Sequence, residues 1–237
     1  MTTSTGNRLD GIELLRSLND QERRDVEIRC RWRRCGKDEQ IVDKDSEDRD
    51  VYFVVEGGVQ IVNYSLSGRE IAFARVSAGG FFGELSAIDG LPRSASVVTT
   101  EPSLLATVSP RHFSDIVTTH PEMAADVLRR LAAIIRTCDE RIMDLSTLGA
   151  VQRVYQQLLR MAQQEDGDEA WQIRGLPTHK AIASLASTTR ETVARSMSQL
   201  ATAGIVERRG RTLQIHDRDT LERLAGAFDD LEEGLSR

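Results

Sequence analysis

Residues 82–97 read "FGELSAIDGLPRSASV", and they place an acid, Glu84, and a cation, Arg93, on one short segment. An Arg guanidinium suits two oxygens of a phosphate at once. Backbone N–H groups from Gly83 onward and the hydroxyl of Ser94 add further donors. A carboxylate is a strong acceptor that fits a sugar hydroxyl, so the stretch predicts a nucleotide pocket. An ion pair between Glu84 and Arg93 is the structural alternative.

The segments around this stretch, from residue 26 to about 108, have the pattern of short antiparallel strands. β-Branched and aromatic residues dominate 51–65, and turn signals recur every 10–20 residues. The run "VEIRCRWRR" (26–34) alternates apolar and basic residues, which predicts a strand, whereas 10–25 has helical spacing. We therefore expect a short helix followed by an antiparallel barrel or jelly roll.

A single long helix is predicted from 121 to 148, because after Pro121 this segment contains neither Gly nor Pro. Its apolar or small residues recur at alternating spacings of 4 and 3, at Ala124, Leu128, Leu131, Ile135, Cys138, Ile142 and Leu145. Such a heptad seam favours a coiled coil between two copies of the chain. The alternative is a helix that packs on its own barrel. Gly149 breaks the helix, and a second amphipathic helix follows.

The stretch 178–203, "THKAIASLASTTRETVARSMSQLATA", has the pattern of a helix-turn-helix. A helix over about 179–186 is followed by a three-residue turn and a second helix from 190 to about 202. Thr188 or Thr189 is the expected N-cap of the second helix. Ser187 takes the turn position at which the chain visits positive φ, where Gly is the commoner residue.

Charged side chains at the start of the second helix suit the reading of base edges. Arg190 and Arg195 can donate to guanine, and Glu191 can accept from cytosine. Beyond this helix, two short strands around an Arg-Gly-Arg turn predict a wing in which Arg209 contacts phosphates. From 174 to 211 there are seven Arg or Lys residues and two acids, although the net charge of the chain is −6. This basic island supports double-stranded DNA as a partner.

The 237 residues are 40% hydrophobic and 29% charged, which is typical of a globular protein. No apolar run approaches the length of about 18 residues that a membrane span needs, so no membrane partner is expected. The first residues, "MTTSTGNRLD", lack an export signal, and the three cysteines are expected to stay reduced in the cytoplasm. The sequence contains no metal-ligand cluster and no nucleophile–base motif, so we expect no catalytic residues, no metal and no enzyme. An enzyme or signalling subunit that uses the barrel alone is the rival class.

The stretch 82–97 resembles the phosphate-binding cassette of cyclic-nucleotide-binding domains. Together with "TTRETVARSMSQL" (188–200), it resembles the Crp/Fnr family of bacterial transcription regulators, and within it the cyclic-AMP receptor protein-like branch. The resemblance implies an α+β fold with an N-terminal antiparallel β jelly-roll, cyclic-nucleotide-binding domain (1–120), a dimerisation helix and hinge (121–148) and a C-terminal winged helix-turn-helix domain (149–237). It also implies a homodimer through the 121–148 helix, no permanently bound cofactor, and RNA polymerase as a further partner.

The resemblance also assigns site residues. In the cassette, ribose and cyclic phosphate are held by Gly83, Glu84, Leu85, Arg93 and Ser94. In the DNA-binding domain, a half-site similar to TGTGA is read by Arg190, Glu191 and Arg195, with His179, Lys180 and Thr189 on or near the DNA backbone.

The resemblance implies cyclic AMP as the effector, but the helix that meets the base departs from the family. The family has a Thr-Ser pair there, whereas this chain has Cys138 and Asp139, with Thr137 just before. Cys138 also fits the heptad seam as a small apolar residue. A carboxylate at Asp139 accepts two hydrogen bonds from guanine against one from adenine, so cyclic GMP is the alternative ligand. A family member that binds DNA without a nucleotide, or with another effector, is the alternative function.

Overall fold

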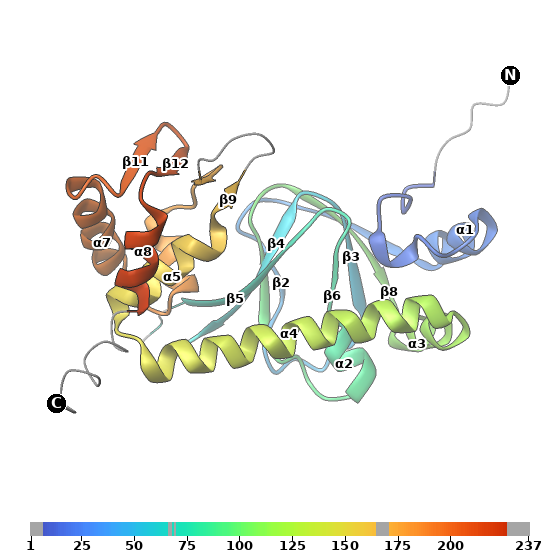
Figure 1. Ribbon diagram of the computed structural model, residues 1–237. Helices are drawn as coiled ribbons and strands as arrows, with labels where there is room; N and C mark the ends of the chain where they lie inside the picture. The colour runs from blue at the N-terminus through green and yellow to red at the C-terminus, as the bar shows by residue number, and fades with distance from the viewer. Residues whose placement is uncertain (1–6, 66–67, 69, 165–170, 227–237) are drawn as a thin grey trace, which may run out of the picture. The chain divides into compact units, whose positions relative to one another are not determined.

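The computed structural model describes residues 7–65, 68, 70–164 and 171–226, and most of its elements are labelled in Figure 1. The chain forms two compact units, Met1–Ile134 and Ile135–Arg237. Their boundary lies inside the long helix α4 (Pro121–Thr147). The expected three-part division, with limits at 120 and 148, stays a prediction. Across the described ranges, none of the helices has the length and apolar character needed to cross a membrane.

The first unit is built on two antiparallel sheets of four strands each, in the orders β1-β8-β3-β6 and β2-β7-β4-β5. The strands are β1 (Arg31–Cys35), β2 (Gln40–Val42), β3 (Val51–Glu56), β4 (Gly58–Tyr64), β5 (Glu70–Ser77), β6 (Phe81–Phe82), β7 (Ser96–Thr99) and β8 (Ser103–Val108). Every strand contributes to one buried apolar cluster, formed by Cys35, Val42, Val54, Val59, Val76, Phe82, Val97 and Leu105. The two sheets therefore share a core, and the predicted antiparallel β domain is confirmed.

A second apolar cluster joins helices of the first unit to the sheet β1-β8-β3-β6. These helices are η1 (Glu13–Leu15), α1 (Asp20–Arg29), α3 (Pro110–Thr119) and the start of α4. The largest buried side chains of the cluster include Phe53 of β3 and Met123 of α4. The remaining helix, α2 (Glu84–Asp89), lies within the cassette stretch between β6 and β7.

The predicted helix over 10–25 and the predicted strand over 26–34 have the wrong limits. Asn19 and Glu22 form a capping box, so α1 begins at Asp20. The helix continues to Arg29 and so includes the first residues of the expected strand. Val26 consequently lies on the buried side of α1 rather than on a strand. The alternation of apolar and basic residues is compatible with either a helix or a strand over these residues, and the capping box favours the helix.

The second unit is a helical domain with a small sheet of order β11-β12-β10-β9. After the end of α4 it contains α5 (Ala150–Met161), β9 (Gln163–Gln164), β10 (Trp171–Ile173), α6 (His179–Leu185), α7 (Arg190–Thr202), β11 (Val206–Arg209), β12 (Thr212–Ile215) and α8 (Arg218–Gly226). Its core includes Val154, Leu158, Ile182, Val193, Leu200 and Leu213. Helices α6 and α7 and the hairpin β11–β12 confirm the predicted winged helix-turn-helix.

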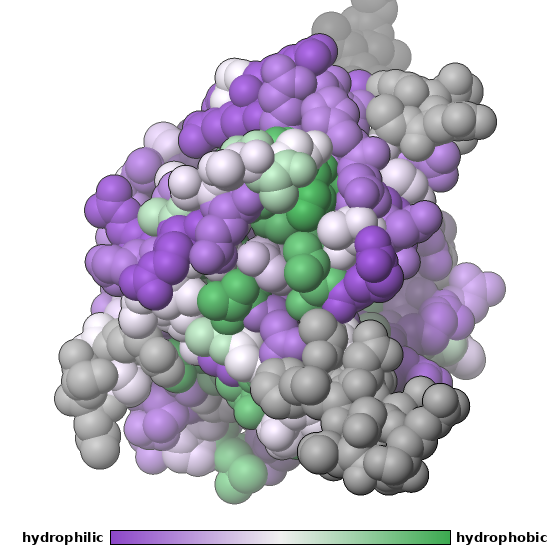
Figure 2. All heavy atoms as spheres, turned by 60° about the vertical axis from the view of Figure 1, so that its left-hand side comes forward, coloured by the Kyte–Doolittle hydropathy of each residue, from purple (hydrophilic) through white to green (hydrophobic). Residues whose placement is uncertain are grey.

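The long helix α4 exposes a row of large apolar side chains, namely Leu128, Ile134, Ile135, Ile142, Met143 and Leu145. The face of the molecule in Figure 2 is mostly hydrophilic, with smaller apolar areas between the polar side chains. Several apolar side chains exposed on a single helix are a typical feature of an interaction surface. Four of them (Leu128, Ile135, Ile142 and Leu145) belong to the predicted heptad seam.

Candidate nucleotide pocket and nucleic-acid interface

Gly83 links β6 to α2 and makes room for the guanidinium of Arg93. Its φ is +90°, a conformation that side chains other than glycine rarely adopt. A Cβ atom at this position would lie 2.6 Å from Nη1 of Arg93 and 2.7 Å from the carbonyl oxygen of Asp50. The glycine of the cassette is therefore required by the close approach of Arg93 as well as by the turn.

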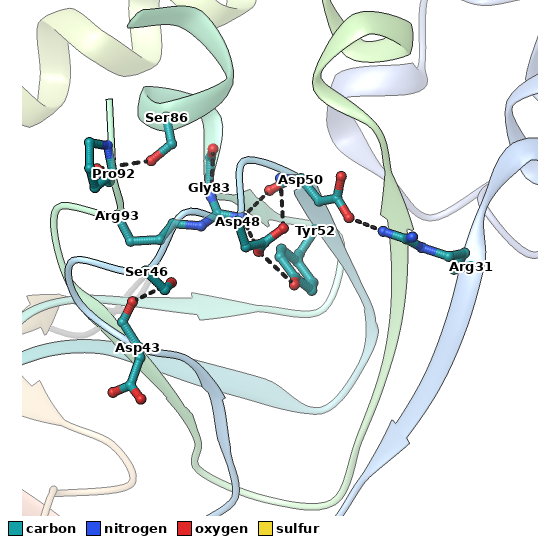
Figure 3. A network of polar contacts seen from close by, with 10 residues as sticks. All are labelled: Arg31, Asp43, Ser46, Asp48, Asp50, Tyr52, Gly83, Ser86, Pro92 and Arg93. Atoms are coloured by element: carbon teal, nitrogen blue, oxygen red, sulfur yellow. Dashed lines mark hydrogen bonds and ion pairs between the residues drawn. The ribbon is translucent and has the colours of Figure 1, made fainter. Parts of the chain in front are cut away.

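Arg93 lies at the centre of a closed polar network, shown in Figure 3. Its Nη2 donates to Oδ2 of Asp48 at 2.5 Å and to the carbonyl of Asp50 at 2.6 Å, and its Nη1 donates to the carbonyl of Gly83 at 3.0 Å. Only 3% of the Arg93 side chain is exposed. Within the described part of the chain, its Nε finds no hydrogen-bond partner. A buried guanidinium with an unused N–H group is suited to binding an anion.

The structural alternative, an ion pair between Glu84 and Arg93, is wrong, because the acid bound to Arg93 is Asp48. Tyr52 supports this acid: its hydroxyl donates to Asp48 Oδ2 at 3.1 Å, and its ring stacks on Phe82. Burial, and then the charge of Asp48, raise the pKa of Tyr52 to about 12, so the hydroxyl stays protonated. Burial is the largest single influence on the pKa of Asp48 and acts to raise it, but the hydrogen bonds from Arg93, Asp50 and Tyr52 and the charge of Arg93 together outweigh burial, so the pKa is lowered.

Glu84 pairs instead with Arg130, which comes from α4. Nε of Arg130 lies 3.3 Å from Oε1 of Glu84, and Nη2 of Arg130 donates to the carbonyl of Phe81 at 2.7 Å. The guanidinium also lies over the Phe81 ring, 4.4 Å from its centre. Glu84 is buried, and a buried carboxylate requires such a partner. Sequence reasoning missed both Asp48 and Arg130, since neither belongs to the cassette stretch.

The other predicted nucleotide-binding residues lie at exposed positions. Leu85 is partly exposed on α2, and Ser94 is exposed just before β7. Thr137, Cys138 and Asp139 are exposed on α4, within the second unit. Their contact with a base stays a prediction.

The helix-turn-helix has the caps and the turn that the sequence predicts. Thr189, rather than the buried Thr188, caps α7: its hydroxyl accepts from the N–H of Thr192 at 3.2 Å. Ser187 has a φ of 50°, which confirms the predicted left-handed turn position. The recognition helix therefore starts at Arg190, directly after a non-glycine turn.

Helix α7 has a buried side and an exposed side. Val193, Met197 and Leu200 face the core, whereas the predicted base-reading residues Arg190, Glu191 and Arg195 are exposed. Hydrogen bonds from its own backbone N–H and from Thr189 lower the pKa of Glu191, so this carboxylate is an ionised acceptor at neutral pH. Of the residues predicted near the DNA backbone, Lys180 and Thr189 are exposed and His179 is half-buried.

In the wing, the hairpin β11–β12, an acidic residue lies beside Arg209, the predicted phosphate contact. Arg209 is exposed on β11, and its Nη2 donates to Oε2 of Glu207 at 2.9 Å. The same oxygen lies 3.2 Å from Nε2 of His216. The hydrogen bond with Glu207 raises the pKa of Arg209. A DNA phosphate at Arg209 would therefore compete with Glu207, a neighbour that the sequence reasoning did not consider.

Two arginines donate hydrogen bonds to backbone carbonyls in and just before the turn of the helix-turn-helix. Arg153 of α5 donates from Nε to the carbonyl of Ala186 at 3.0 Å, and from Nη2 to that of Ser187 at 3.2 Å. Its Nη1 donates to the carbonyl of Leu148, between α4 and α5. Arg141 donates to the carbonyl of Leu185 at 3.0 Å. These bonds fix the turn that precedes the recognition helix.

Comparisons with known proteins agree with this arrangement. Residues 32–120 match the cyclic nucleotide-binding domain, and residues 152–224 match the Crp-like helix-turn-helix domain. The chain is 33% identical over 175 residues to the cyclic AMP receptor protein of Thermus thermophilus, covering 74% of this chain and 79% of that protein. It is 29% identical over 177 residues to a CRP-like cAMP-activated global transcriptional regulator of Mycobacterium tuberculosis, with the same coverage.

Solved structures show the same fold. The catabolite activator protein of Thermus thermophilus superposes with a TM-score of 0.51 at 28% identity, covering 90% of this chain and 98% of that one. A CooA mutant from Carboxydothermus hydrogenoformans gives a TM-score of 0.74 at 21% identity, covering 95% and 98%. A cyclic-nucleotide-binding domain joined to a winged helix-turn-helix defines a class of transcription regulators rather than enzymes. The chain belongs to the Crp/Fnr family of these regulators.

Proposed function

We propose that this regulator acts as a homodimer whose binding to DNA is controlled by a cyclic nucleotide. The observation that carries the proposal is the buried guanidinium of Arg93. Gly83 leaves room for it, and its Nε has no hydrogen-bond partner among the described residues. Cyclic AMP is the first candidate effector, supported by the relative from Thermus thermophilus that is named a cyclic AMP receptor protein. Cyclic GMP is the second, because a carboxylate at Asp139 matches the donors of guanine.

In the proposed complex, Arg93 and Ser94 bind the cyclic phosphate, and Glu84 accepts from a ribose hydroxyl. Gly83 and Leu85 complete this part of the pocket. Thr137, Cys138 and Asp139 contact the base from α4. The ion pair with Arg130 supports the part of Glu84 in the proposal, since it orients this buried carboxylate at the cassette.

The homodimer is proposed to form through α4. The seam residues Leu128, Ile135 and Ile142 are 66%, 61% and 61% exposed, which is unusual for apolar side chains without a partner. Substitution of Ile135 by Glu would place a charge in this seam. We expect it to shift the sedimentation coefficient of the protein to that of a monomer. A dimer that persists in this variant would locate the interface elsewhere.

On DNA, Arg190, Glu191 and Arg195 are proposed to read half-sites similar to TGTGA. His179, Lys180, Thr189 and Arg209 contact the DNA backbone. Two recognition helices of a dimer would reach successive major grooves, about 34 Å apart. The protein would act in the cytoplasm, at promoters, together with RNA polymerase.

Two steps test the proposal. Mass spectrometry of the purified protein identifies any nucleotide that it retains, and titration calorimetry then measures cyclic AMP and cyclic GMP binding to the nucleotide-stripped protein. We expect one of the two to bind, and Arg93→Ala to abolish the heat of binding. An Arg93→Ala variant that keeps its affinity within about twofold of the wild type, a change of less than 0.5 kcal/mol, would contradict the cassette assignment.

A second candidate function is a family member that binds DNA without a nucleotide. The observation that favours it is the closed network around Arg93, in which Asp48 already balances the charge. Under this alternative, the nucleotide-stripped protein binds its DNA with full affinity, and neither cyclic AMP nor cyclic GMP gives a calorimetric signal. A gel shift with and without nucleotide distinguishes the two candidates.

A further inference from the structure

Arg93 of the cassette already binds an anion of the protein itself, the carboxylate of Asp48. Three donors converge on it: Nη2 of Arg93 at 2.5 Å, the hydroxyl of Tyr52 at 3.1 Å, and the backbone N–H of Asp50 at 3.2 Å (Figure 3). The first two bind the same oxygen, Oδ2. A carboxylate that receives three hydrogen bonds, one of them from a buried guanidinium, occupies the kind of position that suits a phosphate oxygen.

The two partners of this ion pair differ in their access to solvent. The Arg93 side chain is 3% exposed, whereas that of Asp48 is 38% exposed. The other acceptors of Arg93 are backbone carbonyls, that of Gly83 between β6 and α2 and that of Asp50 directly before β3. Asp48 is therefore the acceptor of Arg93 whose side chain can rotate away from the guanidinium into solvent without a movement of the backbone.

The fork geometry of the guanidinium makes this departure necessary. Each of its two bidentate edges includes an Nη2–H: one edge pairs Nη2 with Nε, and the other pairs it with Nη1. The two hydrogens of Nη2 serve Asp48 and the carbonyl of Asp50. The unused Nε of Arg93 alone offers a single bond. A phosphate that binds Arg93 through two oxygens must therefore replace one of these acceptors.

We propose that Asp48 occupies the place of the ligand's phosphate in the nucleotide-free protein, and that the cyclic nucleotide must displace it to bind Arg93. This inference rests on the proposed function. A cyclic phosphate and a carboxylate each carry one negative charge, and two anions at a single buried cation repel each other. Displacement frees the hydroxyl of Tyr52 and the N–H of Asp50 together with the guanidinium, so the phosphate gains the donors that Asp48 gives up.

The test is the affinity of nucleotide-stripped Asp48→Asn and Asp48→Ala for cyclic AMP and cyclic GMP, measured by calorimetry. Removing the competing charge is expected to tighten binding by about tenfold or more in both variants. The alanine variant matters because an asparagine oxygen can still accept from Arg93. Thermal melts show that each variant is folded. The double variant that adds Arg93→Gln is expected to lose the gain, because the gain acts through the guanidinium.

Asp45→Asn is the matched control, since it removes the same charge from the same loop. The Asp45 side chain is 77% exposed and pairs with Lys44. Asp45 contacts Arg93 only through the backbone, where its N–H donates to the Arg93 carbonyl at 2.9 Å, and the substitution by Asn keeps this bond. Its φ is +64°, a conformation that asparagine also adopts. We expect its nucleotide affinity to stay within about twofold of the wild type. A gain as large as that of the Asp48 variants would mean that net charge, and not displacement, sets the affinity.

The remaining outcomes are distinct. Unchanged or weaker binding in both Asp48 variants, with measurable binding by the wild type, overturns the inference and makes Asp48 a support for Arg93; the proposed function then stands. Binding by the Asp48 variants alone supports both the inference and the cassette as a nucleotide site. If neither the wild type nor the folded variants bind either nucleotide, the proposed function fails, and the inference fails with it.

Discussion

Glu84 and Arg130 form an ion pair that ties the cassette to the long helix: Nε of Arg130 lies 3.3 Å from Oε1 of Glu84. Arg130 also holds the carbonyl of Phe81, at the end of the strand that precedes the cassette. The carboxylate proposed to bind ribose is therefore oriented by a residue of α4. A substitution of Arg130 is therefore expected to alter the orientation of Glu84 at the proposed ligand site.

Arg130→Gln is predicted to lower both stability and nucleotide affinity. It leaves Glu84 buried without a cation, which is expected to cost about 1–3 kcal/mol in the free energy of unfolding. Denaturant unfolding and calorimetric titration measure the two effects. Arg129→Gln is the control, because the neighbouring arginine is exposed and pairs with Asp126. Equal effects of the two variants would show that the Glu84 pair has no special part.

His120 is predicted to make the stability of the protein depend on pH. The Ile116 carbonyl and Glu22, 3.4 Å away, raise the pKa of His120. A histidine whose folded pKa exceeds its unfolded value of about 6.5 stabilises the protein fully below that pH. The contribution is lost as the pH rises through the folded pKa. Glu22 stays ionised throughout this range, because the Asn19 N–H and His120 lower its pKa.

The measurement is the free energy of unfolding of the wild type and of His120→Gln at pH 5.5 and pH 8.5. The difference between the two proteins is expected to be larger at the lower pH. His112 titrates in the opposite sense, since burial lowers its pKa, and it contributes equally to both proteins. A difference that does not change with pH would show that the charge of His120 adds nothing to stability.

Ser187→Gly is predicted to stabilise the DNA-binding domain. The φ of 50° at Ser187 is a strained conformation for a residue with a Cβ, and glycine relieves the strain. The gain in the free energy of unfolding is expected to be about 1 kcal/mol, partly offset by the greater freedom of glycine in the unfolded chain. Ser187→Ala keeps the Cβ and is expected to show no gain. A stabilisation of similar size by alanine would assign the effect to the hydroxyl.

Glu191→Ala is predicted to relax sequence preference at one base pair of each half-site. Loss of an ionised acceptor for cytosine should cost about 1–3 kcal/mol of discrimination there. Fluorescence anisotropy measures the affinity of each protein for a panel of half-site variants and so detects the change in preference. Arg209→Gln is the contrast, because a phosphate contact weakens binding to all sequences and lowers its salt dependence. An unaltered preference in Glu191→Ala would remove this residue from the reading surface.

The parts of the fold that the sequence predicts well are those that depend on neighbouring residues. The start of α7 at Arg190, the positive φ of Ser187 and the wing follow from caps, turns and periodicity within a few residues. The start of α1 follows from the same kind of signal, the capping box at Asn19 and Glu22, which the alternating pattern concealed.

The partners of the cassette charges could not be predicted in this way. Asp48 lies 45 positions before Arg93, and Arg130 lies 46 positions after Glu84. The fold brings each pair together by placing the loop before β3 and the helix α4 beside the cassette. Within 82–97, Glu84 and Arg93 suggested each other as partners, but the fold gives each one a partner from outside this stretch. The sequence thus predicts a cyclic-nucleotide-binding domain and draws attention to Glu84 and Arg93, but the ion-pair partners of these two residues could not be predicted from it.

A cyclic nucleotide bound at the cassette is proposed to control DNA binding. The most direct measurement is the affinity of the nucleotide-stripped protein for a palindrome of TGTGA-type half-sites, by fluorescence anisotropy at fixed salt, with and without cyclic AMP or cyclic GMP. We expect one nucleotide to tighten DNA binding by about tenfold or more in the wild type and to have no effect in Arg93→Ala. Equal DNA affinity in the presence and absence of both nucleotides would contradict it.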